Sequence, residues 1–174
     1  LGILLQLTSP ATAQSIDLSD WQSLERQTRG ETVYFNAWGG EPRTNNYLAW
    51  VSELMLERYD ITLQHVKISD TAEAVSKVVA QRQAGNDDNG SIDLLWINGE
   101  NFAALKENDL IYGPWAESLP NFKLVNADRF PEMLEDFTVP TQGFESPWTR
   151  AQLVFYYDSQ WLAEPPQDIR QILE

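Results

Sequence analysis

The chain has 174 residues, no cysteine and a formal net charge of −14, from 26 acidic and 12 basic side chains. So acidic a surface repels phosphate backbones, and the sequence shows no basic patch, which argues against nucleic acid as a partner. The lack of cysteine excludes disulfides, thiolate nucleophiles and zinc sites of the cysteine type. With 43% hydrophobic residues, the chain can build a packed core for one domain, or for one domain and part of another.

The first 13 residues carry no charge, open on the apolar run Leu1–Leu5 and close on Ala11-Thr12-Ala13. An apolar run followed by small residues in this pattern is typical of the end of a secretory signal peptide, and it is too short to span a membrane. We expect residues 1–13 to be a signal remnant, cut before Gln14, and the protein to be periplasmic or extracellular. Because no methionine precedes the run, we also expect the chain to begin within its signal.

A strand–loop–helix pattern occurs three times in the next hundred residues. The aromatic run before Trp38-Gly39-Gly40 indicates a buried strand, and Pro42 and Thr44 indicate a helix opening. Spacing of three and four residues between apolar positions indicates helices, and alternation indicates the second strand. We expect strands at 32–37, 61–68 and 92–96, and helices at 45–59, 70–84 and 100–107. Alternating strands and helices predict a mainly parallel sheet with right-handed crossovers.

Local signals predict how some of these elements end. Gly85 suits the residue just past the second helix, Asn98 is a candidate cap for the third, and Asn108 is a candidate left-handed terminator. His65 falls on the polar phase of its strand, so we interpret it as solvated. We expect a short helix at 17–27, an irregular stretch with five prolines over 112–150 and a short helix near 130–136, a strand at 152–157 and a helix from Gln167.

The residues do not assemble into a catalytic or cofactor site. One histidine and no cysteine leave no serine–histidine–aspartate or cysteine–histidine set, and the glycines lack the spacing of phosphate and dinucleotide loops. We therefore expect no catalytic residue, no metal and no cofactor. Two loops remain, each with glycine, tryptophan and glutamate: Trp38 with Glu41, and Trp96 with Glu100. They suit recognition of a ligand, whereas the plainer interpretation is core packing for each tryptophan and a helix-start position for each glutamate.

Several motifs together resemble the extracellular solute-binding proteins of ABC importers, and most of all the YnjB-like branch of that family. The resemblance runs from about residue 31 to the end. It rests on Asn36-Ala37-Trp38-Gly39-Gly40, on Trp96-Ile97-Asn98-Gly99-Glu100-Asn101, on Asp136-Phe137-Thr138-Val139-Pro140-Thr141, on the run Ala151–Asp158 and on Pro165-Pro166.

The resemblance implies an α/β fold of the type II periplasmic-binding-protein kind, in which two lobes close on a ligand. We expect residues 14–30 to be an N-terminal extension, 31–150 the first lobe with a mainly parallel sheet flanked by helices, 151–158 a hinge strand, and 159–174 the start of a truncated second lobe. The implied function is capture of a small solute for a membrane permease, without chemistry on the solute and by a monomer. Predicted ligand-binding residues are Trp38, Gly39, Gly40, Glu41, Trp96, Asn98, Gly99, Glu100, Trp148 and Gln152.

The expected ligand is a small organic cation, thiamine-like or polyamine-like, held between tryptophans and acids. Acidic proteins attract cations, and tryptophan is the best aromatic partner for a cation. An anion is the main rival because helix starts offer backbone N–H groups. Two other functions stay open: an exported two-lobed α/β enzyme, a hydrolase or transferase, and a receptor lobe without transport.

Overall fold

The computed structural model describes residues 20–87, 89–150 and 154–173, so the expected signal remnant and Gln152 lie outside the described residues. The elements are α1 (Trp21–Gln27), β1 (Thr32–Trp38), α2 (Pro42–Tyr59), β2 (Thr62–Ile68), α3 (Thr71–Gln83), β3 (Leu94–Leu95) and α4 (Gly99–Glu107), then the 3-10 turns η1 (Ala116–Ser118), η2 (Phe122–Val125) and η3 (Pro131–Leu134), and finally β4 (Glu135–Asp136), β5 (Val139–Pro140) and α5 (Arg170–Leu173).

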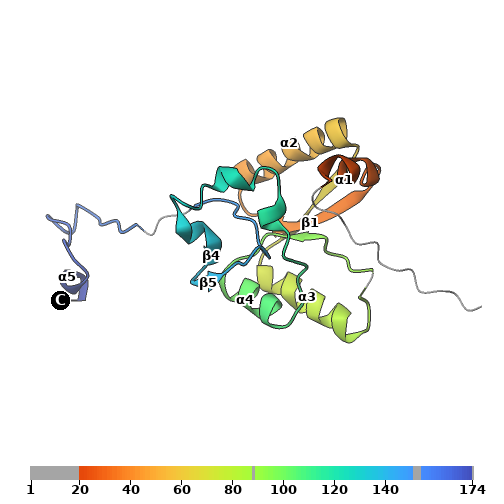
Figure 1. Cartoon of the computed structure of the whole chain (residues 1–174). Coiled ribbons are helices and arrows are strands. Elements are labelled where there is room, and N and C mark those ends of the chain that lie inside the picture. The colour runs from red at the N-terminus through yellow and green to blue at the C-terminus, as the bar shows by residue number, and fades with distance from the viewer. Residues whose placement is uncertain (1–19, 88, 151–153, 174) are drawn as a thin grey trace, which may run out of the picture.

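Three parallel strands form the main sheet in the order β2-β1-β3. Helix α2 takes the chain from β1 to β2, and α3 takes it from β2 past β1 to β3. Because these crossovers run in opposite directions across the sheet, right-handed connections place the two helices on opposite faces. Figure 1 shows α2 on one side of β1, and α3 and α4 on the other. The predicted α/β fold with a parallel sheet flanked by helices is confirmed.

The central strand β1 carries the core. Phe35 and Ala37 are buried against Leu48 of α2, and Trp96, at the end of β3, packs partly buried against this cluster. His65 of β2 lies half-buried, with its ring 6.4 Å from that of Phe35 and its Nε2 3.1 Å from the carbonyl oxygen of Ala37. The interpretation of His65 as a solvated side chain is therefore wrong, since its ring packs near Phe35 and bonds to the backbone of β1.

Strand β3 is shorter than predicted, but the residues just before and just after it also form hydrogen bonds with β1. The backbone N–H of Asp93 donates to the carbonyl oxygen of Tyr34, and that of Trp96 to Asn36. The carboxylate of Asp93 also accepts from the N–H of Tyr34 at 2.8 Å, in place of a backbone carbonyl. The chain around β3 is therefore held along β1 up to Trp96.

The predicted helix ends are correct in one case and shifted in another. Gly85, at φ +73°, follows α3, and the N–H groups of Gly85 and Asn86 return to the carbonyls of Arg82 and Gln81. After α4 the left-handed residue is Asp109, at φ +54°, whereas Asn108 has φ −103°. Asn108 instead donates its side-chain amide to the carbonyl oxygen of Ala104 at 2.8 Å.

The proline-rich stretch forms three 3-10 turns and the small antiparallel hairpin β4–β5. The turn η3 confirms the short helical element expected near 130–136. The hairpin was not predicted. Its two central residues, Phe137 and Thr138, have φ of +45° and +73°, a conformation that favours asparagine and glycine.

The segment 154–173 lies apart from the α/β part of the molecule (Figure 1). Residues 154–157 do not form the strand expected there, and no strand in the described part of the chain pairs with them. Val154, Phe155 and Tyr156 are instead exposed. The role of 151–158 as a hinge stays a prediction. No helix in the described part of the chain is long and apolar enough to cross a membrane.

Candidate functional site

A cavity of about 330 Å³ opens where the strands of the main sheet end. The residues that line it lie at the end of β1, in the loops after β2 and β3, and in the first turns of α3 and α4: Trp38, Ser69, Asp70, Thr71, Trp96, Ile97, Asn98 and Asn101. Strand order explains this position. In an open α/β sheet, ligands bind at the carboxyl ends of the strands, at the point where successive crossovers leave in opposite directions. With the order β2-β1-β3, that point lies between the loops after β1 and β3, which carry Trp38 and Trp96.

The loop after β1 is held by the first turn of α2. Glu41 is the N-cap of the helix, and its carboxylate accepts from the N–H groups of Arg43 and Thr44, at 2.9 and 2.6 Å, and from the Thr44 hydroxyl. These hydrogen bonds, led by the one from Arg43, lower the pKa of Glu41. Asn45 donates its amide to the carbonyl oxygen of Gly39 at 2.8 Å. The loop is thus anchored on both sides of Gly40.

The two glycines of this loop make room for neighbouring side chains. A Cβ at Gly40 would lie 2.5 Å from Cζ2 of the Trp38 ring, and a Cβ at Gly39 would lie 2.7 Å from Cβ of Lys67. The indole of Trp38 therefore folds back over Gly40, and 44% of the residue remains exposed. Trp38 is a surface of the cavity and not part of the core.

The loop after β2 contributes Ser69, Asp70 and Thr71. Asp70 is the N-cap of α3 and accepts from the N–H of Ala72 at 2.9 Å. The hydroxyl of Ser69 donates to the Glu73 carboxylate at 3.1 Å, so the side chain of Glu73 ties the loop to the first turn of α3. Asp70 is the one charged residue in the cavity lining, and its side chain is exposed to the solvent there.

After the loop that follows β3, helix α4 is capped by a residue far away in the sequence. Asn98 occupies the N-cap position of α4, but its side chain makes no capping hydrogen bond. A carboxylate oxygen of Asp136, in the hairpin, accepts instead from the N–H of Gly99. The amide of Asn98 is therefore not used by the helix and lies in the cavity lining.

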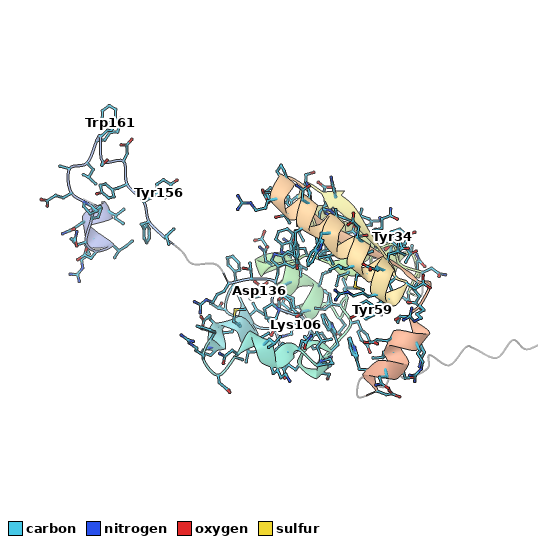
Figure 2. All side chains as sticks on the ribbon, turned by 90° about the horizontal axis from the view of Figure 1, so that it is seen from above. Tyr34, Tyr59, Lys106, Asp136, Tyr156 and Trp161 are labelled. Carbon is cyan, nitrogen blue, oxygen red and sulfur yellow. The ribbon has the colours of Figure 1, made fainter. Side chains whose placement is uncertain are left out.

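Two carboxyl groups lie together behind this cap. Burial raises the pKa of Asp136, against the opposing effect of the Gly99 hydrogen bond. Burial, and then the charge of Asp136, raises the pKa of Glu145 to about 7. The Oε2 atom of Glu145 is buried without a hydrogen-bond partner among the described residues, which fits a carboxyl group that keeps its proton. Figure 2 labels Asp136 and, on α4, Lys106, whose ammonium donates to the carbonyl of Pro140 in the same hairpin.

Four aromatic rings lie in a row that starts at Trp96, in the cavity lining, and continues outside the cavity. The ring centroid of Trp96 lies 5.5 Å from that of Trp148, which lies 5.8 Å from Tyr47 of α2, which lies 5.7 Å from Trp50. We name these four residues the aromatic strip. Trp148, Tyr47 and Trp50 are each about half exposed.

The structure brings three of the ten predicted binding residues into the cavity lining: Trp38, Trp96 and Asn98. Gly39, Gly40 and Glu41 shape the loop behind Trp38, while Gly99 and Glu100 form the first turn of α4 outside the lining. Trp148 touches Trp96, and Gln152 lies outside the described residues. Which of the ten contact a ligand stays a prediction.

Five lining residues were not predicted: Ser69, Asp70, Thr71, Ile97 and Asn101. Three of them follow β2, whose loop has no glycine and was interpreted only as a helix start. The rule that ligands meet the carboxyl ends of parallel strands applies to β2 as well and was the available signal. Among the described residues, no group of three or more histidine, aspartate or glutamate side chains is placed to hold a metal ion.

Comparison with known proteins agrees with this architecture. The family model for bacterial extracellular solute-binding proteins matches residues 49–174. The chain is 47% identical over 171 residues to Protein YnjB of Escherichia coli (strain K12), an alignment that covers 98% of this chain and 42% of that protein. The chain therefore spans less than half the length of this relative. These matches confirm the resemblance predicted from the motifs: the chain belongs to the bacterial extracellular solute-binding protein family, in its YnjB-like branch.

Proposed function

We propose that this protein captures a small organic cation outside the cytoplasmic membrane and delivers it to the permease of an ABC importer. Family membership supports the capture of a solute, and the cavity at the carboxyl edge of the sheet gives it a place to bind. In this proposal the protein is a monomer of the periplasm or the cell exterior, performs no chemistry on the solute, and closes a second lobe over the cavity.

One observation carries the choice of a cation over an anion. Three helices, α2, α3 and α4, begin at the cavity edge, and each N-terminus already holds a carboxylate of this chain: Glu41, Asp70 and Asp136. A helix N-terminus attracts anions through unpaired N–H groups and the positive end of its dipole. Here a carboxylate already accepts from at least one of the first N–H groups of each helix, so an incoming anion would meet negative charge.

The lining offers a cation both aromatic faces and a counter-charge. Trp38 and Trp96 both line the cavity, and a cation over a tryptophan face gains about 0.5–2 kcal/mol. The counter-charge comes from Asp70. It does not come from Glu41 or from Glu100, since neither of these residues lines the cavity.

Calorimetry of the full-length protein against matched panels of organic cations and of carboxylates or oxyanions tests the proposal. We expect a cation to bind, and Asp70→Asn to weaken its binding by roughly tenfold because the counter-charge is lost. Asparagine is as good an N-cap as aspartate, so α3 keeps its cap in this variant.

The matched control is Asp20→Asn. Asp20 is the N-cap of α1 and accepts from the N–H of Ser23 at 3.0 Å, but it does not line the cavity. We expect this variant to bind like the unmodified protein. Tight binding of an anion, or equal effects of the two substitutions, contradicts the proposal.

A further inference from the structure

The cavity alone is small for a solute that carries both a charged head and a further group. Its volume of about 330 Å³ is at the lower end of the range of about 300–1,000 Å³ that ligand sites occupy. The aromatic strip begins inside the cavity at Trp96 and continues beyond it through Trp148 to Tyr47 and Trp50.

The rings of the strip form one continuous apolar surface. Neighbouring centroids lie 5.5–5.8 Å apart, within the range in which aromatic rings touch. Tyr47 is 48% exposed, Trp50 52% and Trp148 46%, so the mutual contacts leave about half of each residue open. Tyr47 and Trp50 lie one turn apart on α2, whose N-terminus adjoins the cavity, so the strip is continuous with the candidate site.

We infer that the aromatic strip is a second subsite, which binds a flat aromatic part of the solute while its cationic head occupies the cavity between Trp38, Trp96 and Asp70. This rests on the proposed function and narrows it to an organic cation with an aromatic body. Trp96 belongs to both subsites, so the cationic head and the aromatic body of the solute bind next to each other. Trp148 and Tyr47 then determine specificity by favouring solutes with a ring over solutes with the same head alone.

The test compares two probes that share a trimethylammonium head. Choline carries no ring, and benzyltrimethylammonium carries one. In calorimetry of the full-length protein we expect the ring to tighten binding by about tenfold, through stacking and apolar burial. Trp148→Ala and Tyr47→Ala should each bring the ratio of the two dissociation constants close to one, because each removes a ring of the strip and keeps the residues that line the cavity.

Two further variants separate stacking from folding. Tyr47→Phe keeps the ring and should keep the ratio, and Tyr112→Ala removes an exposed tyrosine outside the strip and should also keep it. A partly unfolded variant lowers the fraction of protein that binds and leaves the ratio of constants unaffected.

The outcomes distinguish this inference from the proposed function. If choline binds but the added ring has no effect, or if Trp148→Ala and Tyr47→Ala leave the ratio unchanged, the second subsite is wrong and the cation site stands. If neither probe binds and only anions do, the cation site and the subsite fail together. A large loss of stability in both strip variants with an unchanged ratio means that protein, and not solute, covers the strip.

Discussion

At the scale of single residues, the orientation of Trp38 depends on the absence of a side chain at Gly40. A Cβ there would overlap the indole ring, so Gly40→Ala must turn the ring out of its place in the cavity lining. We expect the indole N–H resonance of Trp38 to shift, and binding of an organic cation to weaken by several-fold to tenfold. Two-dimensional NMR of protein with labelled tryptophan, together with calorimetry, measures both.

The control for this change is Gly90→Ala, where the nearest side-chain atom lies 3.9 Å from the added Cβ. We expect neither the Trp38 resonance nor binding to change. An unchanged Trp38 resonance in Gly40→Ala would show that the ring does not rest on Gly40.

A second residue, Glu145, should make stability depend on pH. Its pKa is raised from 4.5 to about 7 in the folded protein, by burial and then by the charge of Asp136. The folded state therefore keeps a proton that the unfolded chain releases near pH 4.5. This contribution to the free energy of unfolding is full below pH 4.5 and is lost as the pH rises towards 7.

We expect the loss to be on the order of 1–2 kcal/mol, a value reduced for the partial exposure of the side chain. Urea unfolding at about pH 5 and about pH 8 measures it. Glu145→Gln should flatten the dependence, whereas Glu53→Gln, on the exposed side of α2, should not. A stability that rises over this range in the unmodified protein, or an equal slope in Glu145→Gln, contradicts the assignment.

Which residues line the cavity could be predicted where a residue's own neighbours determine its place. Trp38, Trp96 and Asn98 lie at or just past the ends of recognisable strands, and strand ends meet at one edge of a parallel sheet. Their contact with a ligand stays a prediction. The acids were harder to assign. Glu41 was expected to face the ligand, but a carboxylate just before a helix can equally accept its first N–H groups, and sequence does not separate these uses.

At the scale of elements, the cap on α4 shows how a distant segment shapes the site. Asp136, in the hairpin β4–β5, accepts from the N–H of Gly99 and takes the capping role that Asn98 was expected to fill. Asp136→Ala should therefore loosen the first turn of α4 and cost about 0.5–2 kcal/mol of stability. Hydrogen exchange at the amides of residues 99–102 should become faster.

The neighbouring substitution Glu135→Ala is the matched control, since Glu135 is exposed and lies in the same short strand. Exchange at residues 99–102 should not change in that variant. Equal exchange in both variants would mean that Asp136 does not stabilise the start of α4.

Elements with strong local periodicity were predictable, and the hairpin was not. Helices α2 and α3 and strand β2 each show their period over seven residues or more. Strands β4 and β5 have two residues each, too few to show alternation. Their turn holds Phe137 and Thr138 at positive φ, where sequence patterns lead one to expect asparagine and glycine. The order β2-β1-β3, which brings Asp70 beside Trp38, results from packing and is not encoded in any local pattern.

At the scale of the whole molecule, the segment 154–173 carries large apolar side chains in solvent. Tyr156 is 96% exposed and Trp161 88%, and Figure 2 shows both on the segment that lies apart from the α/β part. Residues 151–158 were predicted to be the hinge to a second lobe. If so, the full-length protein should close when it binds a solute.

Small-angle scattering measures this closure. We expect the radius of gyration of the full-length protein to decrease on saturation with a cation that calorimetry has shown to bind. The Asp70→Asn variant, which binds less, should need a higher concentration for the same decrease. An unchanged radius at saturation contradicts closure of two lobes around the solute.

The central claim, that solute binds at the carboxyl edge of the main sheet, is tested most directly through the tryptophans. The chain has seven, and each indole N–H gives its own NMR signal in the labelled full-length protein. On titration with benzyltrimethylammonium, we predict that the signals of Trp38 and Trp96 shift together and saturably, while those of Trp21 on α1 and Trp115 beside η1 stay in place. Saturable shifts at Trp21 or Trp115, with Trp38 and Trp96 unmoved, would contradict the site.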